Sequence, residues 1–184
     1  FLPDTYEVYW TVAPMVFVER MRGEYRRFWS PERIHSAQAQ GLSPREALIL
    51  ASIIEEETQY EAERPRIAGV YLNRLRIGMP LQADPTIKFA LGRFDLRRIG
   101  LDHTRTVSPY NTYHRTGLPP GPVCIPSKNA LNAVLAPENH SFLFFCADPL
   151  RAGTHRFATT FAEHTRNAQL YRKSLDRRGV KIQS

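Results

Sequence analysis

The sequence contains only two cysteines, Cys124 and Cys146, and they lack the CxxC spacing of a metal or redox motif. They leave open a single disulfide. We expect His155 and His164 to pack and cap the C-terminal elements, because no third ligand has a suitable spacing for a metal. We therefore expect neither a metal nor a cofactor.

Long apolar runs are also missing, and none approaches the roughly twenty residues that a helix needs to cross a bilayer. The chain begins at Phe1 and not at methionine, so we expect a processed or excised piece with any signal or anchor upstream. Internal repeats and low-complexity tracts are absent. With 42% hydrophobic and 23% charged residues in 184, the composition indicates an ordered domain with one core.

Acidic residues are outnumbered, with 18 Asp and Glu against 25 Lys and Arg, and the net charge is +7. This excess indicates an anionic environment such as nucleic acid, a lipid surface or an acidic polymer. The arginines are scattered, with only short pairs such as Arg26–Arg27, and no basic tract is interleaved with aromatics. A nucleic-acid module is therefore the least favoured of these.

Capping signals predict a chain dominated by helices. Ser30 and Ser43 are each followed by proline, and Glu46 completes a capping box with Ser43. We expect an α+β fold with a small β-sheet and a long Pro/Gly-rich loop over 92–126. Residues 1–10 should be extended. Expected helices cover 12–29, 30–41, 42–58, 63–78, 84–92, 127–137 and 161–175, and expected strands 141–147 and 154–159.

The segment IIEEET sets three glutamates directly against an apolar helical run. On a continuing helix Glu57 lies over Ile53 and Ile54, because side chains three and four apart share a face. An apolar wall would raise its pKa from about 4.3 to about 6, leaving about 10% protonated at pH 7. Like charge on Glu55 and Glu56 would act in the same direction. The alternative is that all three glutamates are simply solvated at a helix end.

Several motifs occur in a specific order: ASIIEEET, VYLNRLRIGMPLQADPT, SPYNTYHRTGLPPGP and the EH of FAEH. Together they resemble the endolytic murein transglycosylases, the MltG/YceG-like family, and FLPDTYEV resembles the start of its catalytic domain. The resemblance covers nearly the whole chain. It implies one catalytic domain over residues 1–184, in which the long loop forms a groove. A membrane anchor and a small murein-binding subdomain would lie upstream, outside this chain.

This resemblance implies a lytic transglycosylase, a lyase of the bacterial envelope that needs no cofactor. It would cut the β-1,4 bond between N-acetylmuramic acid and N-acetylglucosamine inside glycan strands, leaving 1,6-anhydromuramic acid ends. Such cuts would limit strand length during cell-wall synthesis. The implied partners are peptidoglycan strands and cell-wall synthases of the penicillin-binding class. The implied location is the outer side of the cytoplasmic (inner) membrane.

The family's essential acid/base is the second glutamate of E-x-E-T, which matches Glu57 here. Protonated Glu57 would protonate the glycosidic oxygen, and its carboxylate would then take the proton from the sugar's own C6 hydroxyl. The substrate supplies the nucleophile, so a second carboxylate is dispensable. Near Cys124 and Ile125 the sequence departs from the usual family pattern, so local contacts there are expected to differ.

The LQ-x-DPT match suggests a sugar contact for Gln82, while Asp84, with Pro85 after it, is expected to be an N-cap more than a ligand. The predicted substrate-binding residues are Gln82, Asp84, Thr86, Tyr110, Asn111, Thr112 and Tyr113. Turn chemistry after Pro109 is the alternative for the last four. Glu55 and Asn73 are expected to support the site, with Asn73 as a buried hydrogen-bonding hub or a substrate contact.

Two other readings of the same residues stay open. One is a glycan-binding module without activity. The other is a retaining or inverting glycosidase that uses Glu57 together with Asp84 as its two carboxylates. The products separate the second reading from a transglycosylase, because hydrolysis adds one water at each cut.

Overall fold

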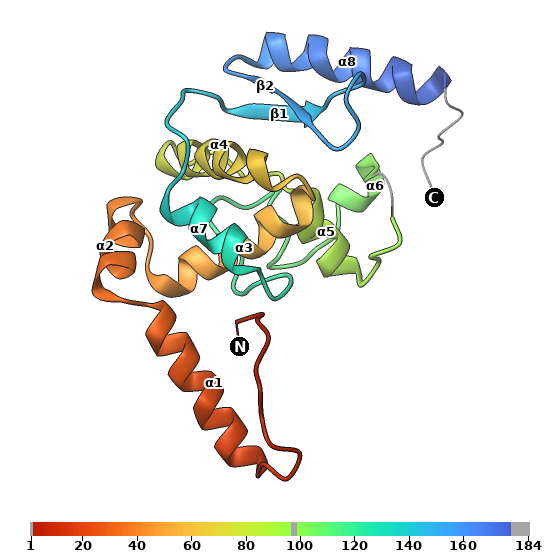
Figure 1. The fold of residues 1–184 in the computed structure, drawn as a ribbon. Helices are drawn as coiled ribbons and strands as arrows, with labels where there is room; N and C mark the ends of the chain where they lie inside the picture. Colours follow the sequence, from red (N-terminus) through yellow and green to blue (C-terminus); the bar gives the residue numbers. More distant parts are fainter. Residues whose placement is uncertain (1, 97–98, 178–184) are drawn as a thin grey trace.

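The computed structural model describes residues 2–96 and 99–177, and helices account for most of its regular structure (Figure 1). The helices are α1 (Pro14–Phe28), α2 (Pro31–Ala39), α3 (Pro44–Glu57), α4 (Arg64–Arg76), α5 (Asp84–Leu91), α6 (Leu101–Thr104), α7 (Lys128–Leu135) and α8 (Phe161–Arg177), with a 3-10 turn η1 (Glu61–Glu63) before α4. Strands β1 (Phe144–Ala147) and β2 (His155–Ala158) pair antiparallel, with Phe144 opposite Ala158. The predicted α+β class is confirmed.

The serine caps start α2 and α3 where the sequence predicted. Ser43 forms a complete capping box with Glu46, and Ser30 accepts a hydrogen bond from the Arg33 backbone. The predicted N-cap at Asp84 is wrong. Ala83 is the N-cap of α5, and Asp84 is already its first helical residue, because the Asp84 carboxylate accepts a hydrogen bond from a tyrosine instead of capping its own helix.

Residues 2–12 run beside α1, which projects from the helical body (Figure 1). No strand occurs in described residues 2–10, so the expected extended segment pairs with no sheet. Leu2 is buried in the core, and the Tyr6 hydroxyl donates to its carbonyl at 2.8 Å. Trp10, at the far end, is fully exposed.

Helix α3 is the centre of the core. Every residue from Ala47 to Ile54 except Leu48 is buried, and the helix packs against α7, α4, α5 and α2. Burying each isoleucine or leucine contributes about 1.5–3 kcal/mol, so this helix has a strongly determined position. Its last residue, Glu57, is therefore held against α4 and α5 by the apolar packing that precedes it.

The β1–β2 hairpin lies between α4 and α8 (Figure 1). Two polar residues of α4 bind the chain leading into it. Asn73 donates to the carbonyls of His140 and Phe142 at 2.8 and 3.0 Å, and Arg74 donates to Leu143 at 2.6 Å. These contacts tie the hairpin to α4, and Asn73 acts as a hydrogen-bonding hub, one of its two predicted roles, although it is only partly buried.

The long segment predicted over 92–126 is ordered in its described part and contains the single turn α6. Both cysteines are free thiols, so the disulfide left open by the sequence does not form in this structure. Among the residues that the structure describes, no helix combines the length and apolarity needed to cross a membrane.

Candidate active site

Glu57 stands at the C-terminal end of α3, partly buried, with its carboxyl directed to α4. The buried Tyr71 hydroxyl donates to Glu57 Oε1 at 2.5 Å. Burial, and secondly the negative charge of Asp84, raise the pKa of Glu57 to about 8, while the Tyr71 hydrogen bond, Lys88 and Arg74 act in the opposite direction. At pH 7 about nine-tenths of the molecules would carry the proton. The carboxyl is a ready proton donor.

The predicted electrostatic help from Glu55 and Glu56 is wrong. Glu55 faces another side of the helix and pairs with buried Arg64 at 2.8 Å, while Glu56 is exposed. Glu55 also accepts hydrogen bonds from the backbone and hydroxyl of Ser127 at 3.0 and 2.5 Å. This residue therefore joins the end of α3 to the start of α7, and it supports Glu57 by fixing the helix end.

A second carboxyl, Asp84, faces the site from the first turn of α5. The Tyr113 hydroxyl donates to Asp84 Oδ1. Burial raises the pKa of the Asp84 carboxyl and that of the Tyr113 hydroxyl above their ordinary values. The negative charge of Asp84 in turn contributes to the raised pKa of Glu57. The site thus contains two carboxyl groups, each hydrogen-bonded by the hydroxyl of a tyrosine from a different segment.

The chain before α5 has a strained turn that exposes Gln82. Gln82 has a φ of 48°, in the left-handed region that residues with a Cβ rarely adopt. Thr112 holds this turn through two hydrogen bonds. Its carbonyl accepts from the backbone N–H of Gln82 at 2.9 Å, and its hydroxyl accepts from the backbone N–H of Ala83 at 3.0 Å. The Thr112 hydroxyl also bonds that of Thr86 at 2.8 Å. Strain held in this way is common at functional sites.

Burial does not fit the predicted substrate contacts for Thr86, Asn111 and Thr112, which are at most 2% exposed. Asn111 donates to the carbonyls of Thr104 and Thr106 at 2.8 and 2.7 Å, and its Oδ1 accepts from the Tyr113 backbone at 3.0 Å. The polar groups of these side chains form hydrogen bonds inside the protein and do not face a substrate. They shape the segments that present Gln82, Asp84 and Tyr113.

Tyr110 is also directed inward. Its ring packs on Phe89 of α5 with centroids 4.6 Å apart, and its hydroxyl lies where a Cβ on Gly121 would come within 2.8 Å. A side chain at position 121 would therefore displace the Tyr110 hydroxyl. Tyr110 joins α5 to the loop, which leaves Tyr113 as the better placed aromatic of the YNTY segment.

The sequence did not assign Tyr71 and Arg74 to the site. Tyr71 shares a helical spacing with Ile67, Val70 and Leu75, a pattern that by itself predicts a core position. A buried tyrosine hydroxyl needs a hydrogen-bond partner, which was the available signal. Arg74 is buried and donates to the carbonyls of Pro80 and Leu81 as well as Leu143, so it fixes the chain leading to Gln82.

No group of three His, Cys, Asp or Glu side chains gathers for a metal in the described parts of the chain. His155 pairs with Glu63 through Nδ1 at 2.9 Å, and His164 stacks on Phe144 at 5.2 Å between centroids. Both histidines thus hold C-terminal elements in place, as their sequence contexts predicted.

Fold and site together define a helix-rich α+β domain whose central helix ends in a partly buried glutamic acid of raised pKa, near a second carboxyl group, Asp84. The sequence profile of the YceG-like family matches residues 1–170, and the chain belongs to this family. The family resemblance seen in the sequence motifs is confirmed.

Curated relatives are named endolytic murein transglycosylases. That of Bacillus subtilis (strain 168) is 39% identical over 130 residues, which cover 71% of this chain and 35% of that protein. That of Streptococcus pneumoniae serotype 2 (strain D39 / NCTC 7466) is 31% identical over 170 residues, covering 90% and 30%. The chain thus spans about a third of the length of these relatives.

A solved structure supports the fold. The 2.6 Å crystal structure of a YceG-like protein from Listeria monocytogenes has 31% sequence identity and a TM-score of 0.72. The match covers 89% of this chain and 51% of that one. The chain therefore shares its fold with this YceG-like protein.

Proposed function

We propose that this domain is a peptidoglycan lytic transglycosylase that cuts inside glycan strands. The observation that carries the proposal is the partly buried carboxyl of Glu57, which accepts a hydrogen bond from the buried Tyr71 hydroxyl in surroundings that raise its pKa. Family membership and the names of the relatives support the same reaction. The bond cleaved would be the β-1,4 link between N-acetylmuramic acid and N-acetylglucosamine.

The reaction needs one group that first gives and then takes a proton. Glu57 donates its proton to the glycosidic oxygen as the bond from C1 to that oxygen breaks. The resulting carboxylate accepts the proton of the C6 hydroxyl while the C6 oxygen bonds to C1. Glu57 is then protonated again, and the product carries a 1,6-anhydro ring. A carboxyl with a pKa of about 8 suits the first step, which needs the acid form at neutral pH.

Asp84 would stabilise the positive charge that develops on the sugar as the glycosidic bond breaks. Tyr113 holds this carboxylate by a hydrogen bond, and Tyr71 occupies one oxygen of Glu57, so Oε2 remains for the substrate. The exposed Gln82 is suited to an amide or hydroxyl of the sugar. In this proposal Gln82, Asp84 and Tyr113 contact substrate.

The position of Asp84 also favours a second candidate, a hydrolase with two carboxylates. Its charge is the second cause of the raised Glu57 pKa, so the two groups lie near one another. In such an enzyme Asp84 would act as nucleophile or would activate water. We place the transglycosylase first because the curated relatives are named endolytic murein transglycosylases.

The proposal extends to the cell envelope. Residues 1–184 would be a catalytic domain on the outer side of the cytoplasmic membrane, held by an anchor upstream. Its products would limit glycan strand length during wall synthesis. Association with penicillin-binding synthases belongs to the same proposal and follows only from the family resemblance.

Mass spectrometry of digested sacculi tests the reaction. The wild-type domain should release fragments with anhydro ends, one water lighter than hydrolysed fragments. Glu57→Gln should cut at least about 10²-fold more slowly, because a general acid contributes 10²–10⁴ in rate. Hydrated reducing ends would establish the hydrolase. Strand binding without cleavage by the wild type would establish the binding module.

A further inference from the structure

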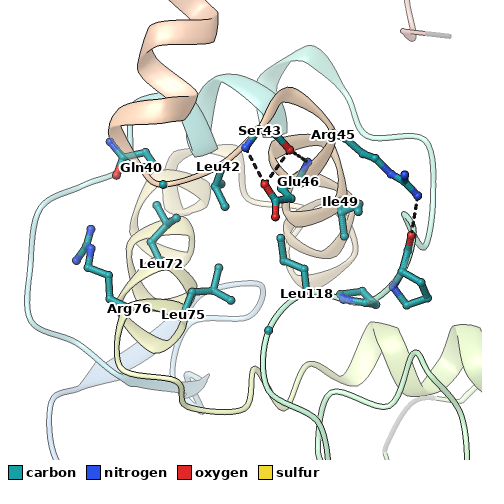
Figure 2. A pocket seen from close by; sticks show the side chains of 14 residues that line it. Gln40, Leu42, Ser43, Arg45, Glu46, Ile49, Leu72, Leu75, Arg76 and Leu118 are labelled. Atoms are coloured by element: carbon teal, nitrogen blue, oxygen red, sulfur yellow. Dashed lines mark hydrogen bonds between the residues drawn. The ribbon is translucent and has the colours of Figure 1, made fainter.

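A large hollow lies beside the start of α3 (Figure 2), whereas Glu57 is the last residue of that helix. The volume of this hollow is about 610 Å³, and it is bordered by the start of α3, the end of α4 and residues 117–120. No residue predicted from the sequence to bind substrate lines it. The hollow is therefore a separate site that the proposed reaction leaves unexplained.

The chemistry of this hollow combines an apolar wall with two cations. Leu72, Leu75 and Leu118 point into it, and Arg45 and Arg76 stand on opposite sides (Figure 2). Both arginines are exposed. Arg45 donates one hydrogen bond to the Pro120 carbonyl at 3.1 Å, and Arg76 donates one to the Asn73 side-chain oxygen at 2.7 Å. Because a guanidinium has five N–H donors, each arginine keeps further donors for a ligand.

The composition of the lining distinguishes between ligands. None of the described residues around the hollow is aromatic, so it offers no ring on which a sugar could stack. Short aliphatic groups suit the leucines, and carboxylates suit the arginines. Glu46 is also present, and both hydrogen bonds from Ser43, at 2.8 and 2.7 Å, fall on Oε2, so Oε1 can accept from an N–H of a ligand. A ligand with carboxylates, methyl groups and amide N–H donors would satisfy all of these groups.

The hollow and the active site are built on the same surfaces. Glu46 and Glu57 lie on one side of α3, because eleven residues make about three turns, roughly 16 Å of helix. On α4, Tyr71 donates a hydrogen bond to Glu57. Leu75, one turn further along the same helix, lines the hollow. The segment after Tyr113 leads directly to residues 117–120. A ligand in the hollow thus lies about 16 Å from the reacting bond.

We propose that this hollow binds the peptide stem of the glycan strand that Glu57 cleaves. This inference rests on the proposed function. Stem peptides carry alanine methyl groups, amides and free carboxylates, which match the leucines, Glu46 and the two arginines. An extended stem of five residues spans about 16 Å, which equals the separation estimated above. The domain would therefore select strands that still carry their peptides.

Binding can be measured without any cleavage. Methyl NMR titrations of Glu57→Gln would use two probes: a disaccharide of N-acetylglucosamine and N-acetylmuramic acid bearing a pentapeptide, and the same disaccharide without it. We expect the peptide-bearing probe to bind about tenfold more tightly and to shift the methyl signals of Leu72, Leu75 and Leu118. Adding Arg76→Ala or Arg45→Ala should remove that tenfold difference, since charge-assisted hydrogen bonds are lost.

Adding Arg151→Ala instead, which removes an exposed arginine of the β1–β2 turn, is the matched control and should keep the difference. Equal affinity for the two probes would overturn the proposal, as would an arginine variant that weakens both probes equally, which would indicate a glycan subsite. Failure of the proposed reaction is seen separately, as wild-type domain that cuts no sacculi. Peptide-dependent binding would still be measured in that case.

Discussion

Replacing Glu57 by glutamine should make the protein more stable at neutral and alkaline pH, and by an amount that depends on pH. In the unfolded chain this carboxyl has a pKa of 4.5, and in the folded protein burial and Asp84 raise it to about 8. Between these values the folded state holds the proton more tightly than the unfolded state. Wild-type stability must therefore fall as the pH rises through this window.

The size of the effect follows from the two pKa values. Each tenfold change corresponds to about 1.4 kcal/mol, so the raised pKa lowers the free energy of unfolding by about 3 kcal/mol at pH 7 and by about 5 kcal/mol above pH 8. Below pH 4.5 the carboxyl is neutral in both states and the cost disappears. Glutamine stays neutral throughout, and its side-chain oxygen can still accept from Tyr71.

Urea unfolding of both proteins at intervals from pH 4 to pH 9 measures this difference. We expect Glu57→Gln to gain stability over wild type progressively between about pH 4.5 and 8, with a constant difference on either side. Glu56→Gln removes the same charge from an exposed neighbouring position and controls for overall charge. A difference between Glu57→Gln and wild type that does not change with pH would refute the reasoning.

Three further predictions concern the same elements. Asp84→Asn removes a charge that raises the pKa of Glu57, so the alkaline limb of the pH–kcat profile should move to lower pH; an unmoved limb would contradict this. Arg64→Leu removes a guanidinium that is only 4% exposed and its charged hydrogen bond to Glu55, which is 22% exposed and keeps its bonds from Ser127, and urea unfolding should show a loss of about 1.5–3 kcal/mol. Gly69→Ala should cost about 1–3 kcal/mol in the same assay, since its Cβ would lie 2.6 Å from the backbone oxygen of Glu138. Its control, Gly23→Ala, meets nothing within 4 Å and should gain about 0.5–1 kcal/mol, and equal effects of the two would count against this reasoning.

Local chemistry made much of the fold predictable. Ser43, Pro44 and Glu46 specify the start of α3 through contacts within one turn, and the structure begins the helix there. Glycine at position 92 has a φ of 64° and ends α5 where the sequence placed the stop. Such capping signals depend on residues within about one helical turn, so they can be recognised without knowing the tertiary contacts.

The candidate site was only partly predictable for the same reason. Helical spacing was enough to select Glu57 among three glutamates, because its apolar support lies on its own helix. The partners that decide its proton affinity, Tyr71 and Asp84, come from two other helices. Nothing near Asp84 in the sequence indicated that Tyr113, 29 residues away, would bind its carboxylate in place of an N-cap role.

The sequence alone thus determined the helix starts, the apolar core helix and the identity of the acidic residue at its end, since these depend on neighbours a turn apart. The tertiary structure decided which polar side chains reach the surface and which are buried in hydrogen bonds inside the protein. Thr86, Asn111 and Thr112 were equal candidates with Gln82 and Tyr113 until packing buried them. Burial also changes the free energy of a charge, and burial is a property of the assembled helices and not of any one segment.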